Sequence, residues 1–198
     1  MPEPPFAAIL LAAGASTRMG RPKQLIRVGG ETLLRRTAGI AVEAGCSPVI
    51  VVLGSGADEM HSELAGLPLA ITVNEDWPEG MASSLRCGLV SIPGLWSAAA
   101  GVLVLVCDQP LLSVEHVRSL LRTQAAGNAL ATASLYRDRA GVPAVFAPQL
   151  FSELMRLQGD QGARELILAH KGQVETVAWA EGALDVDRPE DLKTIGAQ

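Results

Sequence analysis

Short runs of uninterrupted apolar residues recur along the chain and alternate with stretches in which apolar residues have helical spacing. The clearest runs cover residues 6–12, 48–54 and 101–107. A run that is apolar at every position is typical of a strand buried on both faces, as in a parallel sheet. Weaker runs predict further strands at residues 69–74, 129–136, 143–146 and 174–179.

The stretches between these runs predict helices. We expect them over residues 31–45, 57–64, 80–90, 113–126, 148–157, 162–171 and 189–195. Strands that alternate with helices predict an α/β protein whose mostly parallel, Rossmann-like sheet carries helices on both faces. No linker, charge block or repeat interrupts the pattern, so residues 1–198 are expected to form a single domain. In such sheets, ligands bind beyond the carboxyl ends of the strands.

Composition narrows the class of protein. Of the 198 residues, 48% are hydrophobic and 19% are charged, which is ordinary for a globular protein. Cys46, Cys87 and Cys107 show no paired spacing, which argues against a disulfide framework or a zinc site. The apolar runs are too short to cross a membrane, and the first residues lack the pattern of a signal peptide. We therefore expect a cytoplasmic enzyme or binding domain.

Charge is distributed unevenly. The net charge is −5, which argues against a nucleic-acid partner. Residues 1–36 nevertheless hold six basic and two acidic side chains. This local excess indicates a small anion-binding site near the N-terminus. Arg35 and Arg36 fall inside a helical pattern, which favours a solvated helix face for these two.

The segment after the first strand is rich in small residues. It reads L-A-A-G-A-S-T-R-M-G-R-P-K-Q-L over residues 11–25. Small side chains let backbone N–H groups approach a ligand, and Arg18 and Lys23 add cations that suit a polyphosphate. The segment is neither a P-loop nor a dinucleotide-binding fingerprint. Taken alone, a small-residue turn after a strand is as often a plain loop as a binding site.

Acidic residues follow the strand at 101–107 and recur near the end of the chain. Asp108 ends a buried strand, where a carboxylate favours a cation such as Mg²⁺ as its partner, although it can also cap the next turn. Asp185 and Asp187 share one side of an extended segment. By itself, that pair is more typical of acidic residues at a helix start than of metal ligands.

Two more segments carry candidate chemistry. Residues 74–89 contain glycines and serines that could open a helix N-terminus to a base or phosphate; the alternative is a capped helix with Met81 and Leu85 in the core. Residues 159–164, G-D-Q-G-A-R, begin a helix and either bind a second substrate or form a turn with Asp160 as a cap. The three histidines are isolated from each other and from these segments, which favours structural or surface roles.

Together these segments resemble the molybdenum cofactor cytidylyltransferase family, a branch of the MobA-like nucleotidyltransferases. The resemblance rests on residues 11–25, on N-E-D-W-P-E-G-M-A-S-S-L-R-C-G-L at 74–89, on C-D-Q-P at 107–110, on residues 159–164 and on D-V-D-R-P-E-D-L at 185–192. These segments are spread over almost the whole chain.

The resemblance implies that CMP is transferred from CTP to the phosphate of a molybdenum-bearing pterin, with release of pyrophosphate. A molybdenum hydroxylase would then receive the product. The nucleotide-binding residues carried over are Leu11, Ala12, Ala13, Gly14, Ala15, Ser16, Arg18, Lys23, Gly80 and Ser84. Arg18, Lys23 and Asp108 would be catalytic, and Asp108 and Asp187 would hold Mg²⁺. Gly159, Asp160 and Arg164 would bind the acceptor. Relatives that transfer GMP carry glycine at the position of Ala13, so alanine there implies a preference for cytosine.

Two positions depart from the family pattern. Many relatives have threonine in place of Arg188, and some have histidine in place of Val142. Because Val142 falls in the half expected to face the acceptor, the nucleotide side is better supported than the acceptor side. The alternatives are transfer to a phosphorylated sugar or alcohol, a carrier of a pterin cofactor, and a redox enzyme on the same scaffold.

Overall fold

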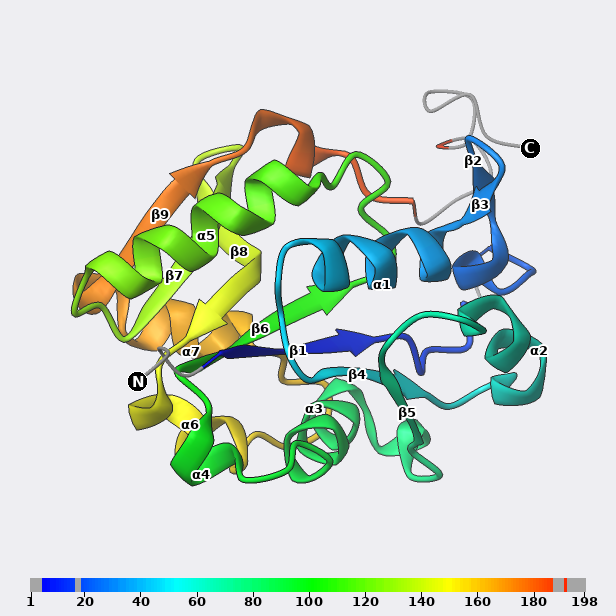
Figure 1. Ribbon diagram of the computed structural model, residues 1–198, viewed down its shortest axis with the longest axis horizontal. Coiled ribbons are helices and arrows are strands. Elements are labelled where there is room, and N and C mark those ends of the chain that lie inside the picture. Colours follow the sequence, from blue (N-terminus) through cyan, green and yellow to red (C-terminus); the bar gives the residue numbers. More distant parts are fainter. Residues whose placement is uncertain (1–4, 17–18, 187–190, 192–198) are drawn as a thin grey trace.

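A seven-stranded sheet forms the centre of the computed structural model, which describes residues 5–16, 19–186 and 191. Its strands are β1 (Phe6–Leu11), β4 (Val49–Leu53), β5 (Ala70–Val73), β6 (Gly101–Val106), β7 (Ala131–Tyr136), β8 (Arg139–Phe146) and β9 (Val174–Ala178). They lie in the order β5-β4-β1-β6-β8-β7-β9 (Figure 1). Each predicted strand is present, and the predicted α/β fold is confirmed.

All strands run in one direction except β8, which is antiparallel to both of its neighbours. The reason is local. Only Arg137 and Asp138 connect β7 to β8, and both have positive φ angles, 48° and 57°. A two-residue connection with left-handed backbone folds a strand back beside the previous one, whereas a parallel neighbour needs a long crossover.

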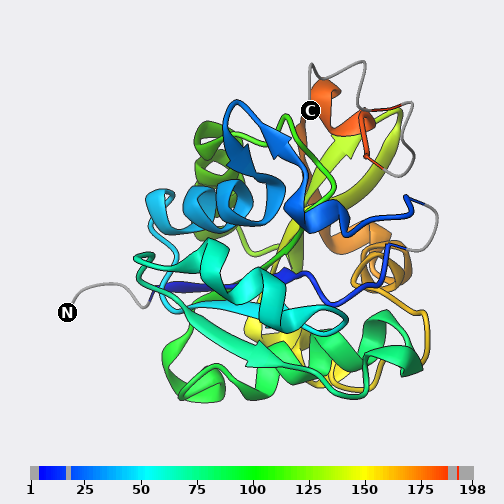
Figure 2. The ribbon, with the colours of Figure 1, turned by 90° about the vertical axis from the view of Figure 1, so that its right-hand side faces the viewer.

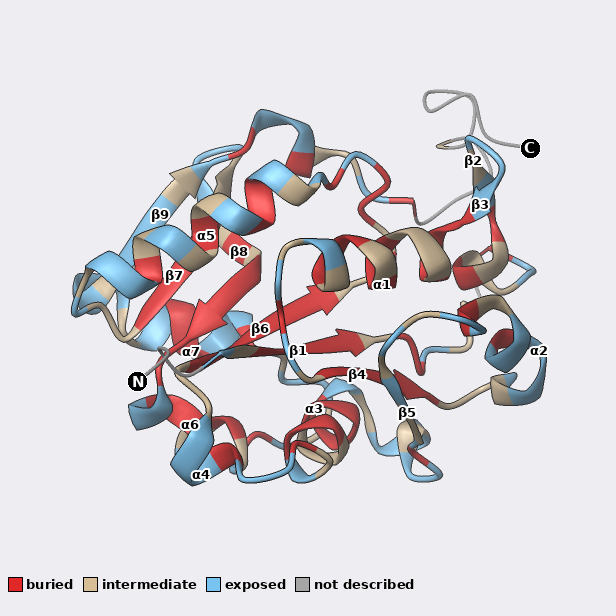
Figure 3. Cartoon of the chain, in the orientation of Figure 1, coloured by how far each residue is buried: buried red, intermediate tan, exposed pale blue. Residues whose placement is uncertain are grey.

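Helices cover both faces of the sheet, as predicted. The helices α1 (Leu33–Glu43), α2 (Ala57–His61) and α5 (Val114–Ala126) pack on the face that includes Ala8 and Leu10. The helices α3 (Met81–Val90), α4 (Leu95–Ala98), α6 (Phe151–Leu154) and α7 (Arg164–Ala169) pack on the face that includes Ile9. Figure 3 shows the inner strands buried, the outer side of α1 mostly of intermediate exposure and much of the outer side of α5 exposed. None of the described helices is long and apolar enough to cross a membrane.

The structure corrects several predicted boundaries. The helix expected over residues 31–45 begins at Leu33, because Glu31–Thr32 forms a short strand β3 that pairs with β2 (Arg27–Val28). The helices expected over 148–157 and 162–171 are shortened to α6 and α7, each flanked by 3₁₀ turns. Apart from residue 191, the helix expected over 189–195 lies outside the described residues.

β8 begins at Arg139, four residues before the predicted start at 143, and contains a bulge. The register shifts from Ala133–Ala144 to Ser134–Gly141, so Val142 and Pro143 have no partner residues on β7. Proline has no N–H and therefore tolerates such a position better than a regular ladder position. The Ser134 hydroxyl donates to the Pro143 carbonyl at 2.6 Å, which holds the bulge against β7.

His116 supports this bulge from α5. Its Nε2 lies 2.8 Å from the Ser134 hydroxyl, and its ring stacks on Trp179 with a centroid distance of 4.7 Å. Since the Ser134 hydrogen is donated to Pro143, the serine oxygen accepts from Nε2–H, which requires a proton on Nε2. His116 is thus structural, as its isolation in the sequence suggested.

The stability of the fold should therefore depend on the protonation of His116. Burial lowers the pKa of His116 to about 4, against the opposing effect of Glu181, whereas a histidine in an unfolded chain has a pKa of about 6.5. Below about pH 6.5, His116 binds a proton in the unfolded chain but stays neutral in the folded chain. The free energy of unfolding should therefore fall as the pH drops toward 4. Urea denaturation at pH 7, 6 and 5 measures this dependence. The His116→Gln variant should be less stable at pH 7 but show a shallower decline; an equally steep decline contradicts the assignment.

Candidate active site

A cavity of about 300 Å³ opens at the carboxyl ends of β1 and β6, on the side of the molecule that faces the viewer in Figure 2. This volume is in the range of sites for small molecules. The lining residues are Leu11, Ala12, Ala13, Gly14, Ala15, Lys23, Gln24, Trp77, Gly80, Met81, Ser84, Val106, Cys107, Asp108 and Asp160. Four segments, around residues 11–24, 77–84, 106–108 and 160, thus meet at one place, where the rule for open α/β sheets predicts a ligand.

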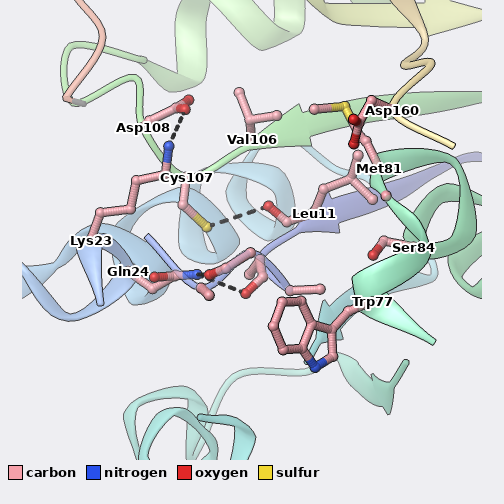
Figure 4. Close-up of a pocket in the computed structure, with 15 residues that line it drawn as sticks. Leu11, Lys23, Gln24, Trp77, Met81, Ser84, Val106, Cys107, Asp108 and Asp160 are labelled. Carbon is pink, nitrogen blue, oxygen red and sulfur yellow. Dashed lines mark hydrogen bonds and ion pairs between the residues drawn. The ribbon is translucent and has the colours of Figure 1, made fainter. Parts of the chain in front are cut away.

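Gln24 holds the loop after β1 in place through hydrogen bonds. Gln24 is only 2% exposed, and its Nε2 donates to the carbonyls of Ala12 and Gly14 at 2.9 and 2.8 Å. Its Oε1 accepts from the hydroxyl of Ser16 at 3.1 Å. Because the two carbonyls are directed toward Gln24, the loop is fixed in one conformation beside the cavity (Figure 4). Gln24 was part of the sequence motif but had no predicted role.

Replacing Gln24 by leucine should destabilise the protein and weaken nucleotide binding together. The variant leaves the buried carbonyl of Ala12 and the partly buried carbonyl of Gly14 without this donor, which should lower the free energy of unfolding by about 2 kcal/mol. Urea denaturation and calorimetric titration with a nucleoside triphosphate measure the two effects. Gln124→Leu, at another buried glutamine far along the chain, is the matched control: it should cost stability without changing nucleotide affinity. Equal losses of affinity in both variants contradict a specific role for Gln24.

Lys23 and Asp108 face each other across one end of the cavity. The Lys23 Nζ lies 2.6 Å from Asp108 Oδ2, and the two side chains are 23% and 21% exposed. Figure 4 shows the pair at the opposite end of the view from Ser84 and Trp77. At such a solvent-accessible edge, the lysine can bind phosphate oxygens and the carboxylate can bind the metal ion of a metal–phosphate group.

The donor set near Asp108 suits a Mg²⁺ ion that is shared with a substrate. The described residues contain no cluster of three or more potential metal-binding side chains. Mg²⁺, however, commonly uses one or two carboxylates together with waters and substrate phosphates, and Asp108 supplies one such carboxylate. The N–H of Val186 donates to the backbone carbonyl of Asp108 at 2.8 Å, so the late acidic segment reaches this edge. Asp187, the second predicted metal ligand, and Arg18, a predicted phosphate ligand, lie outside the described residues.

The other end of the cavity is lined by Ala13, Trp77, Met81 and Ser84, and we call this end the slot. Ala13 is 4% exposed and packs beside Gly54, where an added Cβ would lie 2.8 Å from the Ala13 Cβ and 3.0 Å from the Trp77 Cβ. Glycine at position 54 therefore makes room for both residues. Gly54 lies directly after the buried strand β4. Met81, which one reading placed in the core, is 47% exposed and lines the slot.

The start of α3 is less open than the sequence suggested. Gly80 has a φ of +123°, and an added Cβ would clash with the backbone of Gly159. The carbonyl of Gly159 accepts from the N–H of Ala82 at 3.0 Å. The segment 159–164 therefore covers part of the helix N-terminus. Of its predicted acceptor ligands, Asp160 lines the cavity, whereas Gly159 and Arg164 do not.

The region beyond Asp108 joins the cavity to the β8 bulge. The Val142 carbonyl accepts from Gln109 Nε2 and from the Tyr136 hydroxyl, both at 3.1 Å. Burial and the charge of Asp185 raise the pKa of Tyr136, so its phenol stays neutral. Burial, together with Asp108, also raises the pKa of Cys107, whose thiol donates to the Leu11 carbonyl at 3.9 Å. A protonated, buried thiol is a poor nucleophile, so Cys107 serves packing.

A model of the MobA-like NTP transferase domain matches residues 8–174. The chain belongs to this family. The predicted fold and the predicted resemblance to the MobA-like proteins are thereby both confirmed.

Two relatives that match over almost their full length carry different names. This MobA-like chain is 33% identical to nicotine blue oxidoreductase of Paenarthrobacter nicotinovorans, covering 96% of this chain and 95% of that protein. It is 29% identical to the purine catabolism protein PucB of Bacillus subtilis, covering 98% of each. Among solved structures, Rv0371c of Mycobacterium tuberculosis is similar, with a TM-score of 0.82, 30% identity and coverage of 96% and 97%. A structure of Rv0371c in complex with manganese has a TM-score of 0.79.

Proposed function

We propose that this protein is a CTP-dependent cytidylyltransferase that moves CMP onto the phosphate of a molybdopterin-type cofactor and releases pyrophosphate. The observation that carries the proposal is the arrangement of the cavity. The Lys23–Asp108 pair provides charge at one end, and Ala13, Ser84 and Trp77 line a slot at the other. A nucleoside triphosphate has the same division between a polyanion and a flat base.

In the proposed reaction, an oxygen of the acceptor phosphate attacks the α-phosphorus of CTP. A new P–O bond forms, the bond from the α-phosphorus to the bridging oxygen of the β-phosphate breaks, and pyrophosphate leaves with that electron pair. The attacking phosphate is already an anion, so no strong general base is required. The obstacle is repulsion between two polyanions, which positioning and charge neutralisation overcome.

The chain's own residues would divide this work. The loop of residues 12–16, braced by Gln24, would hold the triphosphate through backbone N–H groups. Lys23 would leave Asp108 and bind phosphate oxygens as negative charge accumulates on the leaving pyrophosphate. Asp108 would hold Mg²⁺, with Asp187 as the second carboxylate. The bound metal supplies charge neutralisation at the triphosphate. Arg18 would add a second cation to the leaving group.

The acceptor would occupy the side of the cavity beyond Asp108. Asp160 lines the cavity directly. The charges of Asp185 and Arg164 both act on the pKa of Tyr136, which places this phenol near both groups. Gln109 and Tyr136 hold the Val142 carbonyl and thereby fix the shape of this side. The product would pass to a molybdenum hydroxylase. A phosphorylated sugar or alcohol as acceptor keeps the same chemistry, and a panel of phosphorylated acceptors distinguishes these possibilities.

A redox role is the second candidate, because one full-length relative is named nicotine blue oxidoreductase. The sequence carries no dinucleotide-binding fingerprint, which favours the transferase. Calorimetric titration with CTP, GTP, ATP and NADPH, each with Mg²⁺, tests the proposal. Selective binding of CTP is expected. A preference for GTP would overturn the cytosine assignment, and binding of NADPH without any response to the triphosphates would overturn the transferase.

A further inference from the structure

Asn74 lies behind Ser84, and three hydrogen bonds fix its side-chain amide. The residue follows β5 and is 6% exposed. The N–H of Asp76 donates to Asn74 Oδ1 at 3.1 Å, which identifies the oxygen end of the amide. Asn74 Nδ2 donates to the hydroxyl oxygens of Ser83 at 2.8 Å and Ser84 at 3.0 Å. Both N–H bonds of the amide are therefore used on two adjacent serines at the start of α3.

The two serines differ in what their own hydrogens can do. The Ser83 hydroxyl donates to the carbonyls of Asp76 and Gly80, both at 2.9 Å, so its hydrogen is used within the protein. Among the described residues, no acceptor is found for the hydrogen of Ser84. Ser84 lines the cavity and is drawn at the slot end of it in Figure 4. Because its oxygen already accepts from Asn74, the Ser84 hydroxyl can satisfy its hydrogen by donating into the cavity.

We propose that Asn74 is a positioning residue that makes Ser84 a hydrogen-bond donor toward the base, so that the slot selects a base with an acceptor atom at this point. This inference rests on the proposed nucleotide site and adds to it the polarity of recognition. A serine hydroxyl without such a neighbour can donate or accept and discriminates less. Cytosine offers two adjacent acceptors, the ring N3 and the carbonyl O2, whereas uracil carries an N–H at position 3.

Asn74→Asp reverses the polarity at almost constant shape. A carboxylate accepts and cannot donate, so it would draw the Ser84 hydrogen away from the cavity. We expect the affinity for the preferred nucleotide to fall by about tenfold or more, with a smaller change for nucleotides that the wild-type protein binds poorly. Ser84→Ala should produce a similar loss. Because Asn74 acts through Ser84, the losses of affinity should not add. The double variant should bind the nucleotide about as well as the weaker-binding of the two single variants.

Ser83→Ala is the matched control. Ser83 shares the same donor on Asn74, yet its hydroxyl bonds only to protein groups, so the substitution tests a purely structural role. We expect it to lower thermal stability while changing nucleotide affinity by less than about twofold. If Asn74→Asp does not fold, Ser84→Ala against Ser83→Ala still tests the base contact. The donor polarity is then tested with 3-deaza-CTP and 2-thio-CTP, each of which weakens one acceptor of cytosine.

Calorimetric titration of the four variants and the wild-type protein with CTP, UTP, GTP and ATP in the presence of Mg²⁺ measures these affinities. Loss of base preference in both Asn74→Asp and Ser84→Ala, with Ser83→Ala close to wild type, supports the inference. Equal losses in Ser83→Ala and Ser84→Ala, or a uniform loss for all four nucleotides in Asn74→Asp, overturn it. In the analogue test, wild-type affinity for both analogues equal to that for CTP also overturns it.

The failures of the two proposals are distinguishable. A wild-type preference for GTP or ATP overturns the cytidylyltransferase assignment, and the variants then test the polarity of Ser84 on that nucleotide. If the wild-type protein prefers CTP but Asn74→Asp and Ser84→Ala change nucleotide affinity as little as Ser83→Ala does, the Asn74 inference alone is overturned. Binding of none of the four nucleotides by the wild-type protein overturns both.

Discussion

Asp108→Asn should lower the rate of nucleotidyl transfer by about a hundredfold or more while leaving the fold intact. The asparagine side chain keeps the shape of aspartate but loses the negative charge that would hold Mg²⁺ against the triphosphate. Removing one electrostatic contact to the developing charge typically costs two to three orders of magnitude in rate, roughly. The effect should appear in the turnover number, because the charge matters most as pyrophosphate leaves.

The fold should survive this substitution. The Asp108 side chain is 21% exposed, and its only described ion pair, with Lys23, is partly open to solvent and contributes little to stability. The bond that ties Asp108 to Val186 uses the backbone carbonyl, which asparagine retains. Release of pyrophosphate measures turnover, and circular dichroism with thermal melting monitors the fold. Asp58→Asn, on the exposed start of α2, is the control and should be neutral in both assays. A folded Asp108→Asn protein with normal turnover rules out the metal assignment.

The sheet could be predicted because its strands are apolar at almost every position. The strands β1, β4 and β6 are buried on both faces between two layers of helices, which hides such runs from water. Edge strands follow the same pattern more weakly. β5 and β9 each pair with a neighbouring strand along one edge only, and their predicted ranges, 69–74 and 174–179, extend beyond the observed strands by one residue at an end.

The direction of β8 could not be read from hydrophobic pattern. An apolar run is the same in either direction, so only the turn decides. Arg137 and Asp138 are not the glycine or asparagine residues that usually announce a tight hairpin, although both adopt left-handed backbone here. The β2–β3 hairpin was also missed, because strands of two residues leave no periodicity to detect.

The sequence predicted most of the residues that line the cavity, but not the buried residues that hold them in place. Small residues, a lysine and an aspartate at strand ends have an obvious use, and ten of the predicted site residues line the cavity: Leu11, Ala12, Ala13, Gly14, Ala15, Lys23, Gly80, Ser84, Asp108 and Asp160. Gln24 and Asn74 escaped functional assignment because an amide side chain has no chemistry of its own. Their importance comes from partners eight to twelve residues away, which only the three-dimensional structure identifies.

Lys23→Met should change metal and nucleotide affinity in opposite directions. In the structure the Lys23 ammonium lies against the carboxylate that would bind the metal, with 2.6 Å between Nζ and Asp108 Oδ2. A divalent ion that approaches Asp108 without a nucleotide must therefore compete with this ammonium. Removing the ammonium should raise the affinity for Mn²⁺ alone by up to about fivefold, the range expected for a partly exposed ion pair.

The same substitution should weaken binding of CTP with Mg²⁺ by about tenfold or more, because a charge-assisted bond to the triphosphate is lost. Mn²⁺ titration followed by electron paramagnetic resonance measures the first effect, and calorimetry with CTP and Mg²⁺ measures the second. Lys171→Met, an exposed lysine distant in the sequence, controls for the loss of one positive charge and should change neither. A parallel fall in both affinities would mean that Lys23 only orders the loop. Opposite changes would mean that Lys23 moves from Asp108 to the phosphates, which couples metal binding to the arrival of the nucleotide.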